Sequence, residues 1–204
     1  MDKDVGVAQD DDSHRRRAEV PVSHSFGADL LANRAQVESL DARAAELREA
    51  SAAAGRPVTC AARCWTCCCH AVDCGTMDAV QIAMVLRDAG RDAPSLRHRL
   101  AAAGRQQERM SPDKYFSRQR PCIFLGDDRL CTVYPVRPVA CRLHCSVTEP
   151  SLCRTLGGEG ISFKALLDEH SASCDDFARR TKWPSGGSLP AMALLALRVL
   201  ERGP

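Results

Sequence analysis

The chain has 204 residues, which is enough for one compact domain with appendages. Apolar residues make up 45% of it and aromatic residues only 4%, so a core has to be built mainly from aliphatic side chains. The 28 basic and 26 acidic side chains leave a formal net charge of +2, which gives no reason to expect nucleic acid or an anionic membrane as the main partner.

Residues 1–24 are predicted to be a disordered charged tail, because an acidic run is followed by a basic one. This stretch lacks the apolar segment of a secretory signal, and the apolar window 191–200 is too short to span a bilayer. We therefore expect a cytoplasmic protein without a membrane partner. In such a reducing compartment disulfides do not persist, so the dense, patterned set among the twelve cysteines is expected to bind metal.

Residues 25–204 are predicted to form a single, mainly α-helical domain of four to five helices, with its core at 58–153. Apolar residues recur every three or four positions between 28 and 54, and Gly55 and Pro57 end that pattern. Further helices are expected at 77–89, 94–109, 162–170 and 191–201, and a loop at 111–120. Two apolar runs around Gly126-Asp127-Asp128 could form a short β-hairpin over 122–134.

Two cysteine-rich blocks lie on the irregular segments between these helices. Thiolates two or three residues apart can converge on one ion when the backbone between them turns tightly. Eight or nine clustered cysteines exceed the four that one ion or one cubane cluster needs, so we expect two sites or one multinuclear site. The blocks are expected to converge although residues 69–121 separate them. The predicted metal ligands are Cys60, Cys64, Cys67, Cys68, Cys122, Cys131, Cys141 and Cys153, with Cys69 and Cys145 as weaker candidates.

Polar residues beside these cysteines are expected to support the site. His70, Arg137 and Arg142 could offset the negative charge of a thiolate site through hydrogen bonds to the ligands. Thiolate suits both zinc and iron, including an iron–sulfur cluster, so the ligand type leaves the metal open. The isolated residues Cys74 and Cys174 are expected to be core or surface thiols. His144, inside the second block, is expected, like His70, either to donate to a ligand or to be one itself. The other four histidines are expected at the solvated surface: His14, His24, His98 and His170.

At the two blocks the sequence resembles the CxxCxxCC family of zinc- or iron-chelating domains, the YkgJ-like cysteine-cluster proteins. The matching segments are Cys60 to His70, Pro121 to Leu125 and Cys131 to Arg142, with Cys153 or Cys145 as the later cysteine. Trp65-Thr66 replace the small residues that are usual before the paired cysteines. The resemblance implies a metal chelator, and a related cluster occurs in flagellin lysine methylases, which resemble iron–sulfur, S-adenosylmethionine-dependent enzymes.

The function expected from the sequence is therefore that of an intracellular zinc- or iron-binding protein with a structural, metal-handling or redox role. The alternative is a metal-dependent enzyme, either similar to the iron–sulfur methyltransferases or a redox enzyme. The sequence contains no Gly-rich nucleotide fingerprint, no Ser/His/Asp arrangement and no paired-carboxylate motif that would identify a reaction.

Overall fold

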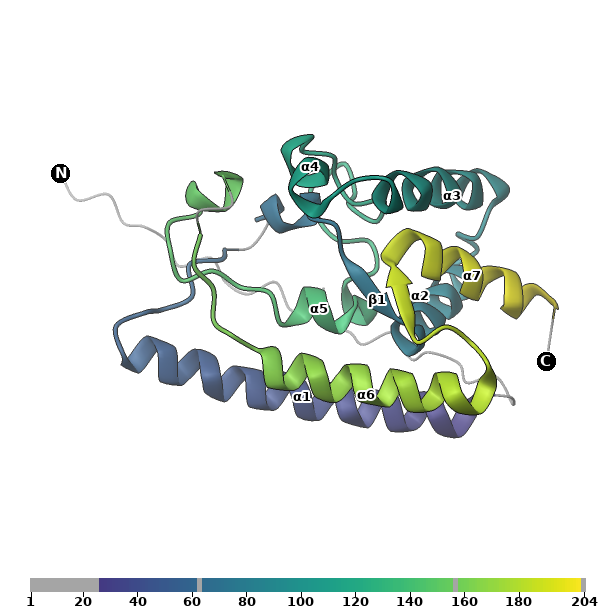
Figure 1. Ribbon diagram of the computed structural model, residues 1–204, viewed down its shortest axis with the longest axis horizontal. Coiled ribbons are helices and arrows are strands. Elements are labelled where there is room, and N and C mark those ends of the chain that lie inside the picture. Colours follow the sequence, from purple (N-terminus) through teal and green to yellow (C-terminus); the bar gives the residue numbers. More distant parts are fainter. Residues whose placement is uncertain (1–25, 62–63, 156–157, 203–204) are drawn as a thin grey trace.

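A computed structural model describes residues 26–61, 64–155 and 158–202, and this part of the chain is mainly helical, as predicted (Figure 1). The predicted tail at 1–24 lies outside the described residues. None of the described helices is long and apolar enough to cross a membrane. The elements in chain order are α1 (Gly27–Ala53), η2 (Thr66–Cys69), β1 (Asp73–Gly75), α2 (Thr76–Asp88), α3 (Pro94–Glu108), α4 (Pro112–Ser117), η3 (Tyr134–Val136), α5 (Val139–Arg142), η4 (Leu152–Thr155), α6 (Lys164–Thr181), β2 (Gly186–Ser188) and α7 (Leu189–Arg202).

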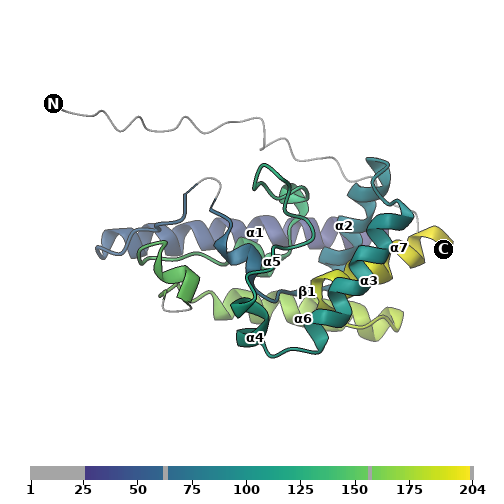
Figure 2. The same cartoon turned by 90° about the horizontal axis from the view of Figure 1, so that it is seen from above.

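Helices α1 and α6 lie side by side and run in opposite directions along one edge of the molecule (Figures 1 and 2). The apolar stripe of α1 packs on the domain's own core, because Leu40 and Ala44 are buried in a cluster with residues of α5 and α6. Such a stripe is what the three-and-four spacing predicts. This pair supports the short helix α5, which carries Cys141.

Helices α2, α3 and α7 form a second packed group, which contains most of the larger apolar cluster. Helix α2 is buried along most of its length, and Gly90 follows it in the left-handed conformation (φ 63°). The Arg91 N–H then donates to the Leu86 carbonyl at 2.7 Å, which satisfies a carbonyl left free at the helix end. The strands β1 and β2 pair antiparallel, with Asp73 opposite Ser188 and Gly75 opposite Gly186, and both strands contact α7.

Three local expectations differ from the structure. Residues 112–117 form the helix α4 instead of a loop, because Ser111 accepts a hydrogen bond from the Lys114 N–H and Pro112 fits the first helical position. The segment 122–134 forms a turn with one bridge, Leu125 to Cys131, while the two-stranded sheet joins segments that are far apart in the sequence.

Helix α6 continues to Thr181, well beyond the predicted end at 170. Its buried stripe, which has helical spacing, consists of Leu166, His170, Cys174 and Phe177. The placement of His170 at the solvated surface was therefore wrong: only 5% of it is exposed. His98 is exposed, whereas His14 and His24 lie outside the described residues.

Candidate metal centre

The two cysteine blocks lie against each other, as the sequence predicts. The Cys122 N–H donates to the Cys68 carbonyl at 2.7 Å, which joins the end of the first block directly to the start of the second. The 3₁₀-helix η2 begins right after Trp65 and holds three consecutive cysteines in one tight turn. A backbone hydrogen bond thus joins the two blocks independently of their side chains.

A first group of thiols consists of Cys67, Cys122, Cys131 and Cys141, which come from four different segments. Cys122 and Cys131 stand at the two ends of the turn closed by the Leu125–Cys131 bridge. Cys141 is presented by the single turn of α5, which starts after Pro138. Each of the four interacts electrostatically with at least two of the others, so the four sulfur atoms share one neighbourhood.

Burial and mutual repulsion keep these thiols protonated in the absence of a cation. Burial, together with the nearby Cys131 and Cys67, raises the pKa of Cys122 to about 11, although a hydrogen bond from the Phe124 backbone acts to lower it. Burial likewise raises the pKa of Cys141 to about 12, with Cys122, Cys131 and Cys67 adding to the effect. Placing several thiolates so close together therefore requires a compensating positive charge.

Cys68 and Cys69 extend this first group. The pKa of Cys67 is raised first by its hydrogen bond with the Cys68 thiol and then by burial. The Cys69 side chain is fully buried, and burial, followed by the nearby Cys67, raises its pKa. Cys68 is thus placed to take part with Cys67, whereas Cys69 points into the core.

A second group lines a cavity of about 120 Å³ on the other side of η2. The cysteines that line it are Cys60, Cys64, Cys145 and Cys153, together with His70 and His144. Cys67 also lines this cavity, so it lies between the two groups. Both candidates for the later cysteine, Cys145 and Cys153, belong to this second group.

The second group is held by pairing of irregular segments that lie side by side in both views (Figures 1 and 2). The Thr59 N–H donates to the Ser146 carbonyl at 2.9 Å, and the Ser146 N–H donates to the Cys60 Sγ at 3.3 Å. Ser146 also forms a bridge with Gly160. These bonds bring Cys60, from the first block, next to Cys145, from the second.

The three supporting residues predicted from the sequence have different surroundings. The Arg137 guanidinium stacks over the Tyr134 ring at 3.7 Å, and its charge acts to lower the pKa of Cys67, Cys131 and Cys141. The Arg142 guanidinium donates to Asp41 at 3.0 Å and to backbone carbonyls, and thereby ties α5 to α1.

His70 stacks on Phe116, with ring centroids 4.2 Å apart, and faces His144 at 5.6 Å. Burial, followed by the neighbouring His144, lowers the pKa of His70, so its imidazole is neutral near pH 7. A neutral imidazole is the form that binds metal.

The donor atoms suit a thiophilic metal, but their spacing is not that of a formed coordination shell. Among the described residues, no three His, Cys, Asp or Glu side chains converge closely enough to hold an ion. The sulfur atoms of either group would have to move toward one another by side-chain rotation before they could share a metal.

Sequence reasoning missed a buried polar cluster next to these groups. The His170 Nε2 lies 3.1 Å from the Asp78 Oδ2 and 3.7 Å from the Cys174 Sγ, and Cys74 is buried nearby. The Asp78 carboxylate also accepts a hydrogen bond from the Val139 N–H, at the start of α5. The signal was the spacing of His170 and Cys174, four residues apart on the apolar face of a helix that we had predicted to end earlier.

Comparison with known proteins gives no relative, because no family model, curated protein or solved structure matches the chain. The resemblance to the CxxCxxCC family therefore stays a prediction from its motifs.

Proposed function

We propose that this protein binds zinc or iron through two neighbouring sets of thiolates. One set is Cys67, Cys122, Cys131 and Cys141, with Cys68 beside it. The other is Cys60, Cys64, Cys145 and Cys153. Each set contains four sulfur ligands, the number that a tetrahedral zinc ion or a cubane cluster takes.

The observation that carries the proposal is the assembly of cysteines from distant segments into two groups of four. Buried cysteines that serve only as small apolar residues have no reason to gather, since any aliphatic side chain would fill the same space. Cys74 and Cys174 show that alternative, because both are buried in the core, where Cys74 packs in the larger apolar cluster and Cys174 contacts His170. Arg137 supports the proposal, since a tetrathiolate site carries excess negative charge that a neighbouring guanidinium offsets.

A metal would act on the spacing as well as on the charge. Metal binding releases the thiol protons, and the ion then attracts the thiolates, which would repel one another without it. Rotation about the Cα–Cβ bond shifts a sulfur atom at the cost of one rotamer change. The short cysteine turns allow that change without moving a long helix.

The test is the metal content of protein purified under anaerobic conditions, measured by elemental analysis. We expect about two ions per chain if eight thiolates serve two tetrahedral sites, and more iron if clusters form. Iron–thiolate absorbance near 400 nm indicates iron, whereas metallated protein without colour indicates zinc. Protein that contains no metal, and takes up none when zinc or iron is added, would contradict the proposal.

Matched variants assign the ligands. Cys131→Ala and Cys153→Ala should each remove about half of the bound metal, because each belongs to one set only. Cys74→Ala and Cys174→Ala serve as controls and should leave the metal content unchanged. If all four variants lost metal equally, the division into two sets would be wrong.

The alternative from the sequence, a metal-dependent enzyme, gains support from one observation. A second cavity opens directly beside Cys122, so a molecule bound there would lie next to the first thiol set. An enzyme would bind and convert a substrate in this cavity, whereas a protein with a purely structural metal site would not.

A further inference from the structure

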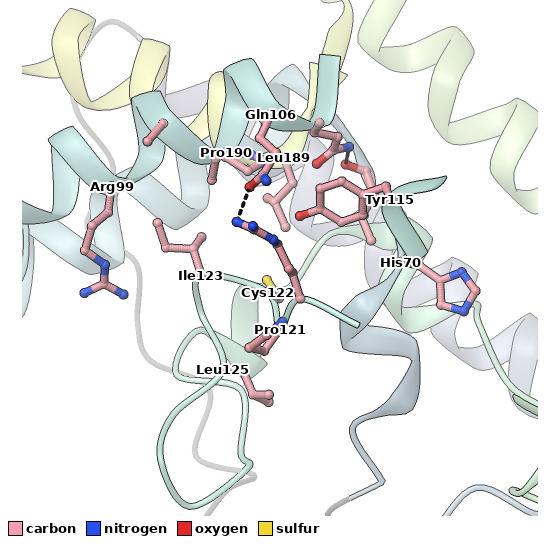
Figure 3. A pocket seen from close by; sticks show the side chains of 15 residues that line it. His70, Arg99, Gln106, Tyr115, Pro121, Cys122, Ile123, Leu125, Leu189 and Pro190 are labelled. Atoms are coloured by element: carbon pink, nitrogen blue, oxygen red, sulfur yellow. Dashed lines mark hydrogen bonds between the residues drawn. The ribbon is translucent and has the colours of Figure 1, made fainter. Parts of the chain in front are cut away.

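The cavity beside Cys122 has a volume of about 500 Å³, within the range of small-molecule sites (Figure 3). Helix α3 forms one wall, α4 and the turn at 120–125 form the others, and the start of α7 closes the end. Its apolar lining includes Val72, Ala103 and Leu189. It is therefore large enough for an organic molecule, and part of that molecule can be apolar.

The charges around this cavity have a single sign. Arg99 and Arg120 line it, and none of the described residues that line it is acidic. The Arg120 Nη1 donates to the Gln106 Oε1 at 3.0 Å, a hydrogen bond marked by the dashed line in Figure 3, and this contact holds the guanidinium at the cavity.

Two further groups face the same space. In Figure 3 the Tyr115 hydroxyl and the Cys122 sulfur both point toward the region between Gln106 and Pro121. Tyr115 is 7% exposed, and its phenolic hydroxyl can donate a hydrogen bond into this space. Guanidinium and hydroxyl donors on an apolar floor are the groups that bind an oxyanion attached to an apolar body.

We propose that this cavity binds a small organic oxyanion, a carboxylate or a phosphate ester with a short apolar part, next to Cys122. The anion lies against Arg120 and Tyr115, and the apolar part lies on Val72 and Leu189. Such a ligand would contact a sulfur atom of the first thiol set. The binding itself does not require the proposed metal function, so either can fail without the other.

The test is an NMR titration of isotope-labelled protein, as purified, with hexanoate and hexyl phosphate as probes. Hexanol and inorganic phosphate serve as matched probes that lack the charge and the apolar part. We expect one or both organic anions to shift the amide signals of residues around the cavity. Hexanol and inorganic phosphate should bind at least about tenfold more weakly, because a charge-assisted hydrogen bond contributes roughly that factor.

Arginine variants locate the anion. Arg120→Gln should weaken binding of the organic anion by roughly tenfold, and Arg99→Gln in the same chain should weaken it further. Arg118→Gln is the matched control, since Arg118 is also exposed and lies close by in the sequence but does not line the cavity. Equal weakening in the control would overturn the proposal, and so would equally tight binding of hexanol or inorganic phosphate.

Discussion

Asp78 and His170 form a buried ion pair that links three helices. Asp78 lies in the first turn of α2, and His170 lies on α6. The Asp78 carboxylate also accepts a hydrogen bond from the Val139 N–H at the start of α5. Both side chains are almost fully buried, with 4% and 5% exposed. Removal of one member leaves the other as an uncompensated polar group in the core.

Asp78→Ala should therefore lower the free energy of unfolding by about 3–5 kcal/mol. The measurement is urea unfolding followed by circular dichroism. Asp176→Ala is the control, because Asp176 pairs with Arg180 at the exposed surface of α6 and its loss should leave the unfolding midpoint nearly unchanged. Similar midpoints for the two variants would show that the buried pair does not stabilise the fold.

The charge of His170 gives the pair a defined pH dependence. Burial opposes protonation, but contacts with Asp78 and Cys174 outweigh it and raise the pKa to about 10. Since the folded-state pKa lies above the unfolded value near 6.5, this stabilisation is fully present below about pH 6.5 and is lost as pH rises through about 10.

The stability difference between the wild-type protein and His170→Gln should accordingly shrink between pH 6.5 and pH 10. Urea unfolding of both proteins across that range measures it, and taking the difference cancels the titration of groups that His170 does not contact. A difference that stays constant or grows with pH would mean that His170 is neutral in the folded protein.

At the scale of elements, Gly75 determines how closely β1 approaches α6. A Cβ atom at this position would lie 2.6 Å from the Cys174 Sγ and 3.2 Å from the His170 Nε2. Both neighbours are buried, so they have little room to move. Gly75→Ala should destabilise the protein by about 1–3 kcal/mol through overpacking.

A double variant tests the cause of this effect. Cys174→Ala removes the sulfur atom that the new methyl group would meet, so Gly75→Ala should cost less in that background than in the wild-type protein. Urea unfolding of the wild-type, the two single variants and the double variant gives the coupling energy. Strict additivity would mean that the contact with Cys174 is not the source of the strain.

The elements that could be predicted from sequence are those with local signals. The repeat in α1 and the glycine after α2 predicted helix ends to within about two residues, because spacing and end-capping residues act over one or two turns. The pairing of β1 with β2 could not be predicted, since three-residue strands with glycines carry no alternating pattern. The extension of α6 was missed because a buried histidine interrupts its apolar stripe.

In the candidate site, too, features with a local sequence signal could be predicted, whereas features that depend on contacts between distant segments could not. The short spacings predicted that the cysteines from Cys60 to Cys69 lie close together, since neighbouring residues in a tight turn remain neighbours after folding. They did not predict that this block divides between the two groups. The assignment of Cys145 to the group of Cys60 depends on the pairing of Thr59 with Ser146, which is a contact between distant segments. The cavity beside Cys122 also depends on long-range packing, because α3 and α7 form its walls.

At the scale of the whole molecule, the aliphatic helical core and the segments that carry the two thiol sets differ in what can stabilise them. Aliphatic packing dominates where α2, α3 and α7 meet, and this cluster includes many of the fully buried side chains. The segments that carry the two thiol sets have little regular structure of their own. If metal binds there, its binding free energy contributes to the order of these segments more than to the helical core.

Removal of metal should therefore loosen the molecule unevenly. After treatment with a chelator under reducing conditions, amide hydrogen exchange should become faster in 58–61, 64–72, 120–155 and 158–160, where most of the backbone is irregular. Exchange in α2 and α7 should change little, because their hydrogen bonds are internal to the helices and covered by apolar packing. The measurement is hydrogen exchange followed by mass spectrometry of peptides, with Cys74→Ala protein as a control that keeps its metal before treatment. Unchanged exchange in these irregular segments would show that metal does not order them. Equal acceleration in α2 and α7 would show that the whole domain, and not only these segments, depends on the metal.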